Sequence, residues 1–110
     1  MTTKINPQEL EWTEGNVKNF FGKELLMLDN GTLKLVKVAP SSHYPEHRHP
    51  DKTEYAYVLK GLPHFQIGAD EFAASPDEFY VFPTGVRHAI RNKTEETCIL
   101  LVGSIKNKHD

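Results

Sequence analysis

Apolar and polar residues alternate in short segments along this chain, and Gly and Pro separate the segments. Residues 23–28 lead into a hairpin signal at residues 29–31, and residues 32–38 alternate as the return strand. Residues 54–60 alternate again and end at Gly61. Further strands are expected over residues 64–68, 78–82 and 97–105.

This pattern predicts an all-β fold. Helical spacing occurs only weakly, over residues 4–18, where Pro7 and Gly15 interrupt it. Residues 39–50 are polar and contain proline, which is typical of a connecting loop. Seven or eight short strands at close intervals indicate an antiparallel sandwich or barrel.

The domain organisation follows from the length of 110 residues, which suits one domain with its own core. We expect the barrel over residues 23–105, an N-terminal segment at residues 1–22 that packs on it, and a polar tail at residues 106–110. The sequence shows no repeat and no low-complexity linker that would mark a second domain.

Charge and composition exclude several classes of function. The 13 basic and 15 acidic residues give a formal charge of −2 with neither sign in a block, so nucleic acid and anionic membranes are not expected partners. Cys98, the single cysteine, permits no internal disulfide and no thiolate zinc site. The first residues lack the pattern of a leader and no apolar run approaches the roughly 20 residues of a membrane span, so we expect a cytoplasmic protein.

A group of histidines and a glutamate suggests a metal site. His47 and His49 are two residues apart, so on an extended strand both face one side while Arg48 faces the other. Glu54 begins the next strand, and His88 follows much later. Three imidazoles and one carboxylate suit divalent iron, manganese, nickel, copper or zinc, and on an octahedral ion they leave two positions open.

The spacing of these residues resembles the first motif of the cupin family. That motif reads glycine, five residues, His-x-His, three or four residues, glutamate, six residues, glycine. Four residues separate His49 from Glu54 here, and six separate Glu54 from Gly61. The resemblance implies an antiparallel jelly-roll barrel, also called a double-stranded β-helix, with His47, His49 and Glu54 as metal ligands.

The second motif of the family also has a match. It reads glycine, five residues, Pro-x-Gly, two residues, histidine, three residues, asparagine, and Pro83, Gly85, His88 and Asn92 fit it in full register. The resemblance makes His88 the fourth ligand. Only residues 62–76 lie between the motifs, a short segment with little chain for a lid, so we expect a small ligand.

Two positions depart from the family pattern. The first glycine of each motif is replaced, by Ser41 and by Asp77. These glycines usually occupy turns in which φ can be positive, a conformation that Asp tolerates better than Ser does. We expect a local shift of the backbone at these positions and no loss of the fold.

Three polar residues are predicted to line the cavity. His64 and Gln66 are candidates on one strand, although an exposed strand position is the plainer interpretation of His64. Tyr44 precedes the ligands, where it either gates the site or belongs to a solvated loop. Arg87 is adjacent to His88 and is expected to point away from the site, and His109 in the tail is given no function.

The pattern also bears on assembly. If Glu54 points inward, Ala56 and Val58 follow it, and the outer face of the strand carries Tyr55, Tyr57 and Leu59. An apolar row of this kind is expected to be covered. A second copy of the chain in a homodimer is favoured, and the alternative is the N-terminal segment around Trp12, Phe20 and Phe21 folded over this strand.

The functional hypothesis is a small metalloenzyme. A dication with three neutral imidazoles and one carboxylate carries a charge near +1, which favours an anionic oxygen ligand such as a carboxylate or an enediolate. A dioxygenase-type reaction on a small oxygen-chelating substrate is favoured, and resemblance to related dioxygenases implies that Glu54 can also take a proton. The alternatives are a metal-dependent isomerase or lyase, and a cupin that binds or senses a small ligand without catalysis.

Overall fold

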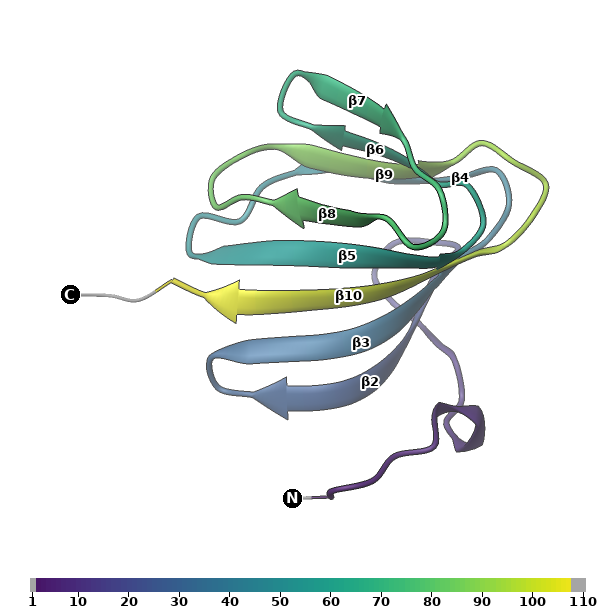
Figure 1. The fold of residues 1–110 in the computed structure, drawn as a ribbon, viewed down its shortest axis with the longest axis vertical. Coiled ribbons are helices and arrows are strands. Elements are labelled where there is room, and N and C mark those ends of the chain that lie inside the picture. Colours follow the sequence, from purple (N-terminus) through teal and green to yellow (C-terminus); the bar gives the residue numbers. More distant parts are fainter. Residues whose placement is uncertain (1, 108–110) are drawn as a thin grey trace.

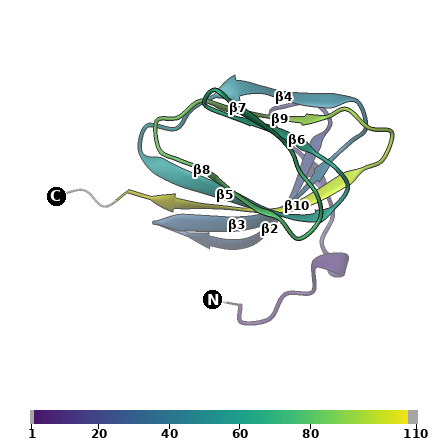
Figure 2. The same cartoon turned by 45° about the horizontal axis from the view of Figure 1, so that its top comes forward.

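The computed structural model describes residues 2–107 as two antiparallel sheets that face each other (Figures 1 and 2). The larger sheet has the strand order β1 (Thr13–Glu14), β2 (Phe20–Leu28), β3 (Gly31–Val38), β10 (Cys98–Lys106), β5 (Lys52–Lys60) and β8 (Phe79–Phe82). The smaller sheet has the order β4 (Ser42–His47), β9 (His88–Asn92), β6 (His64–Ile67) and β7 (Asp70–Ala73). The predicted all-β jelly-roll barrel is therefore confirmed.

The core lies between the two sheets. The side chains of Val58, Phe65 and Leu100 are fully buried there, and the Phe65 ring meets the rings of Tyr80 and Phe82 edge to face at 4.8 Å and 5.5 Å. Each strand places alternate residues in this layer, as a pleated sheet requires. The prediction that Ala56 and Val58 follow Glu54 inward is confirmed, since both are completely buried.

The sequence did not predict four of the strands, which are β1, β4, β7 and β9. β4 contains Pro45 and lies in the stretch interpreted as a loop, because its inward residues include Ser42, Tyr44 and His47 and so lack an apolar alternation. β7 and β9 are short and flanked by polar turns. The weak helical spacing at residues 4–18 corresponds to a 3-10 turn at Pro7–Glu9 and to β1. The described residues include no helix long and apolar enough to cross a membrane.

The two replaced glycines keep the conformation of glycine. Ser41 has a φ of 54° and Asp77 a φ of 71°. The expected shift of the backbone is therefore wrong, because the pairing around each turn holds the chain in place. The Ser41 N–H donates to Thr94 O at 3.3 Å, and the Asp77 N–H donates to Val58 O at 2.8 Å.

The N-terminal segment packs on one end of the larger sheet. β1 pairs with β2, and the ammonium groups of Lys23 and Lys37 lie 4.6 Å and 4.9 Å from the centroid of the Trp12 ring. Trp12 therefore lies over β2 and β3 and does not cover β5. On the other end of this sheet, Phe79 and Val81 stay 55% and 44% exposed.

Candidate metal centre

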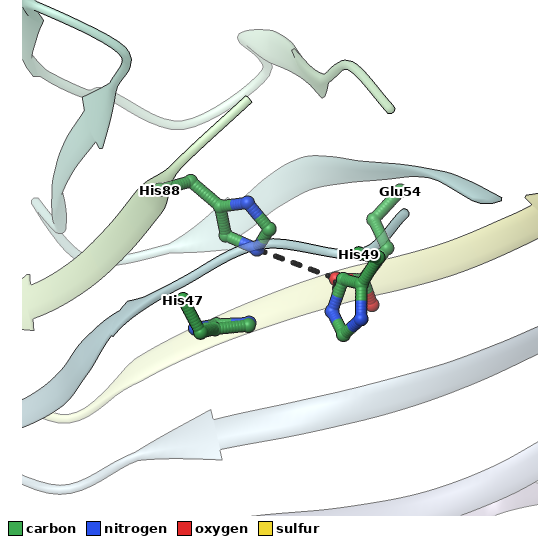
Figure 3. Close-up of side chains that lie close together, drawn as sticks. All are labelled: His47, His49, Glu54 and His88. Carbon is green, nitrogen blue, oxygen red and sulfur yellow. Dashed lines mark ion pairs between the residues drawn. The ribbon is translucent and has the colours of Figure 1, made fainter. Parts of the chain in front are cut away.

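Four side chains from three places in the sequence converge between the sheets. His47 ends β4, His49 follows it, Glu54 lies near the start of β5, and His88 begins β9 directly opposite His47. One ligand atom from each of these residues lies within 4.8 Å of all the others. Figure 3 shows the four side chains turned toward one another.

A β-bulge in β4 aims His47 into the barrel. The pairing of β4 with β9 shifts register between Tyr44 and His47, so that both residues point inward although they are three positions apart. Pro45 lies in the bulge, where its missing N–H leaves no donor unpaired. Glu46 points outward, and its Oε2 accepts a hydrogen bond of 2.7 Å from Gln66 Nε2.

The distances suit a divalent metal ion. Glu54 Oε1 lies 2.7 Å from His49 Nε2 and 3.3 Å from His88 Nε2. Neighbouring ligand atoms on an octahedral ion with bonds of about 2.1 Å are about 3.0 Å apart, and opposite ones are about 4.2 Å apart. The largest separation of 4.8 Å thus needs a contraction of only about half an ångström. The four residues fit a metal ion by type and by spacing.

The backbone orients two of the imidazoles. His47 Nδ1 lies 2.9 Å from Pro45 O, and His88 Nδ1 lies 3.4 Å from Val86 O, so the first contact is a good hydrogen bond and the second a weak one. With the proton on Nδ1, each Nε2 presents its lone pair to the centre of the group. Carbonyl partners of this kind fix the ring and make the nitrogen a better ligand.

The protonation states of Glu54 and His49 also favour metal binding. Burial alone would raise the pKa of Glu54, but a hydrogen bond from His88, formed when its Nε2 carries the proton, and the nearby positive charge of His49 and Lys52 outweigh it and lower the pKa. Burial lowers the pKa of His49, and the attraction of Glu54 only partly offsets this. The carboxylate and the neutral imidazole are the forms that bind a metal ion.

A cavity of about 900 Å³ opens beside the four ligand atoms. Its apolar wall includes Phe82, Ile90 and Val102, and the Phe82 ring stacks on His88 with 4.7 Å between centroids. Residues 10, 11 and 13–17 of the N-terminal segment form part of the rim. The cavity is therefore larger than the short segment between the motifs suggested, because the sequence interpretation gave these residues only a packing role.

The predicted substrate residues divide into two groups. Tyr44 lines the cavity, with its ring 4.7 Å from that of His47. His64 and Gln66 do not line it, because they flank the buried Phe65 and so face away from the core on the outer side of β6. The structure thus places these two residues outside this cavity. Arg87 points outward as expected and pairs with Glu46 at 3.3 Å.

Sequence reasoning missed the lysines of the cavity lining, among them Lys34 and Lys52 on the inner face of the larger sheet. A signal for each is visible afterwards. Lys34 shares a strand face with Val36 and Val38, and Lys52 shares one with Glu54. A lysine on the same face as core residues belongs to the inside of a barrel unless it lies beyond the sheet.

The comparisons with known proteins agree with this geometry. The chain is 28% identical over 67 residues, 61% of its length, to a polyketide synthase, CurC, of Streptomyces cyaneus, of which this match covers 44%. The chain spans less than half the length of the curated relatives it matches.

Solved structures of similar fold include a predicted oxalate decarboxylase from Thermotoga maritima, at a TM-score of 0.88 and 17% identity over 96% of this chain and 100% of that one. The polyketide cyclase RemF from Streptomyces resistomycificus matches at 0.80 and 21% identity over 98% of this chain and 83% of that one. Identities this low show a shared fold alone. The family model for the cupin domain matches residues 34–103, most of the barrel. With both motifs and the jelly-roll barrel in place, the chain belongs to the cupin family.

Proposed function

We propose that this cupin is a metal-dependent enzyme that acts on a small organic substrate with adjacent oxygen donors. The observation that carries the proposal is the convergence of four ligand atoms within 4.8 Å on the wall of a cavity of about 900 Å³. Four protein ligands on an octahedral ion leave two neighbouring or opposed positions for a substrate. A closed structural site would leave none.

Charge selects the substrate class. Neutral imidazoles at His47, His49 and His88 and the Glu54 carboxylate leave a charge near +1 with a dication. A carboxylate, an enediolate or a deprotonated hydroxy ketone is therefore the preferred guest. The cavity wall of Phe82, Ile90 and Val102 suits the carbon skeleton of such a molecule.

A dioxygenase-type oxidation is the first reaction class to test. When bound, a divalent transition metal supplies Lewis acidity, or electron transfer if it is redox-active. Glu54 Oε1, between His49 and His88, is the group of this chain best placed to hold a substrate proton. Tyr44 adds a hydroxyl on the same cavity, and burial raises the pKa of that hydroxyl, with the Glu54 charge adding to the effect. Tyr44 therefore acts as a hydrogen-bond donor.

A redox-neutral isomerase or lyase is the second candidate. It is favoured by the similarity in fold to the polyketide cyclase RemF and by the sequence match to the polyketide synthase CurC. The same ligands and the same proton acceptor serve this chemistry. The native metal determines which assay comes first: iron or manganese directs it to oxygen consumption, and zinc directs it to redox-neutral conversion.

A third reading is a cupin that binds a ligand without converting it. An enzyme needs at least one polar group besides the metal ligands near the substrate. Tyr44 and Lys52 line the cavity in that role. This placement supports the enzyme over the binder.

Metal content tests the proposal. The wild type should contain close to one equivalent of a transition metal by elemental mass spectrometry, and His88→Ala and Glu54→Ala should lose most of it. His64→Ala is the matched control, because this histidine lies on the outer face of β6. Equal metal loss in all three variants, or a wild type that takes up no metal on reconstitution, would contradict the proposal.

We also propose that two copies of the chain pair through the larger sheet. Four of its strands, β3, β10, β5 and β8, form an outer face of about 19 Å by about 26 Å, which is a flat area on the order of 500 Å². Because aromatic side chains protrude from this face, its accessible area is larger than the flat area and approaches the roughly 600–1,000 Å² that each partner buries in a standard interface. Tyr55, Phe79 and Val81 form an uncharged patch on β5 and the edge strand β8, which a twofold axis can place against itself without repulsion.

A further inference from the structure

Lys34 occupies an unusual position on the inner face of the larger sheet. It stands in register between Val102 on β10 and Glu24 on β2, and it alternates with the core residues Val36 and Val38. Its side chain runs over Gly22, since a Cβ on that glycine would lie 4.0 Å from Lys34 Cδ. Lys34 therefore lines the cavity, where it is exposed.

The charge of Lys34 has no partner within the described part of the chain. Its ammonium forms no ion pair and no side-chain hydrogen bond with residues 2–107, although Glu24 faces it across the strands. A bulge at Leu25 shifts the register of β2 immediately beyond Glu24. An exposed lysine ammonium on the cavity wall that forms no ion pair is available to an anionic ligand, and the same wall carries Glu11, Glu14 and Glu24.

The distance from Lys34 to the metal ligands sets the length of a substrate that could contact both. Lys34 and Glu54 lie two strands and one inner row apart, which places their Cα atoms about 12 Å apart in a pleated sheet. A molecule that reaches from the metal ligands to the Lys34 ammonium therefore needs a chain of about four carbons between its two acidic ends. Such a molecule fits within a cavity of about 900 Å³.

We infer that Lys34 binds a second anionic group of the substrate, so that the substrate class is a small organic dianion with one chelating end and one distal carboxylate. This inference rests on the proposed metal-dependent function and adds a specificity-determining residue to it. Lys52 lies on the same strand face as Glu54, close to the chelating end, and Lys34 marks the distal end.

A matched pair of hydroxy acids tests the inference by binding alone. 2-Hydroxyadipate has a chelating end and a distal carboxylate, and 2-hydroxyhexanoate has the same chelating end with a methyl group instead. Isothermal titration of zinc-loaded wild type should give about tenfold or tighter binding of 2-hydroxyadipate. Lys34→Met should remove this preference and leave the affinity for 2-hydroxyhexanoate within about twofold.

Lys37→Met is the matched control, because Lys37 is on the same strand but on the outer face against Trp12. This variant should keep the preference for 2-hydroxyadipate. A wild type without the preference, which would mean that Glu24 neutralises Lys34 in solution, overturns the inference, and so does a preference that survives in Lys34→Met.

The zinc titration that precedes this experiment separates the two proposals. A wild type that does not bind zinc contradicts the metal-dependent function itself. A wild type that binds zinc but does not distinguish the two acids overturns only the role of Lys34. Retention of zinc by Lys34→Met shows that any loss of preference arises at the distal end of the ligand.

Discussion

The outer faces of the two sheets differ sharply although both sheets follow the same alternation. On the smaller sheet, Gln66 and Arg87 both contact the Glu46 carboxylate, at 2.7 Å and 3.3 Å. On the larger sheet, the rings of Tyr55 and Phe79 lie 5.6 Å apart and Phe79 is 55% exposed. One outer face is thus completed by its own polar side chains, and the other leaves apolar area uncovered.

This difference shows what an alternating pattern determines. The pattern fixes which residues enter the core, and the inner faces of both sheets are accordingly apolar around Phe65, Val58 and Leu100. The pattern does not determine whether the outward residues are polar or apolar. Polar outer residues suit contact with water, and exposed aromatic outer residues suit contact with another protein surface.

The largest expected effect is a loss of stability when the core between the two inner faces is disrupted. Phe65→Ala should lower the free energy of unfolding by about 3–5 kcal/mol, because the ring is fully buried between the sheets and contacts Tyr80 and Phe82. Urea denaturation followed by circular dichroism measures it. Phe72→Ala, at a ring that is 38% exposed, should cost clearly less. Equal costs would show that the core is not centred on Phe65.

The second prediction concerns a charge introduced into the apolar outer face of the larger sheet. Phe79→Lys should convert the proposed dimer into a monomer, because a twofold contact would bury two like charges near each other. We expect the dissociation constant to rise by about thirtyfold or more, which corresponds to about 2 kcal/mol. Light scattering over a concentration series measures the mass.

Gln66→Lys on the smaller sheet is the control for this variant and should leave the mass unchanged. A monomeric wild type would exclude the proposed pairing. A Phe79→Lys variant that stays dimeric would move the interface to another surface.

A smaller effect is expected where the chain enters each sheet. Ser41 precedes β4 in the smaller sheet with a φ of 54°, so Ser41→Gly should raise the free energy of unfolding by about 0.5–1 kcal/mol. Asp77 precedes β8 in the larger sheet with a φ of 71°, but its Oδ1 also accepts a hydrogen bond of 3.0 Å from Tyr57 Oη on the outer face. Asp77→Gly should therefore gain less. Thermal unfolding of both variants compares them, and a loss of stability in Ser41→Gly would argue against strain at that turn.

The smallest effect on stability is expected on the polar outer face of the smaller sheet. Arg87→Ala removes the ion pair with Glu46, in which the Arg87 side chain is 62% exposed. Because exposed pairs contribute little, the free energy of unfolding should fall by at most about 0.5 kcal/mol, with no change in molecular mass. Urea denaturation in low and high salt checks this value. A loss above about 1 kcal/mol would mean that the polar network is structural.

The sequence predicted the barrel and the four candidate ligands because both depend on local spacing. His47, His49, Glu54 and His88 occupy fixed positions in two motifs, and pairing of β4 with β9 brings the motifs together. β4 itself was missed because its inward residues are polar. The motifs in the sequence thus located the site although β4, the strand that ends at His47, was not predicted.

The remaining parts of the cavity depended on contacts between distant segments. His64 and Gln66 were assigned to the cavity from their residue types, but the burial of Phe65 between them turns both outward. Lys34 was overlooked because it lies outside both motifs and its place beside the cavity depends on the β3–β10 pairing. Side-chain direction on a strand is decided by which neighbour is buried, and one sequence gives that only where the alternation is clear.

The hydrogen bond between His47 Nδ1 and Pro45 O has a consequence for the speed of metal uptake. Pro45 and His47 belong to one short bulged stretch, so the ring is held by its own strand and needs no distant partner. An imidazole restrained in this way loses little rotational freedom when an ion arrives. Association should then be limited by the ion's release of its own water shell, so fast-exchanging ions such as zinc load rapidly and nickel, which exchanges water slowly, loads last.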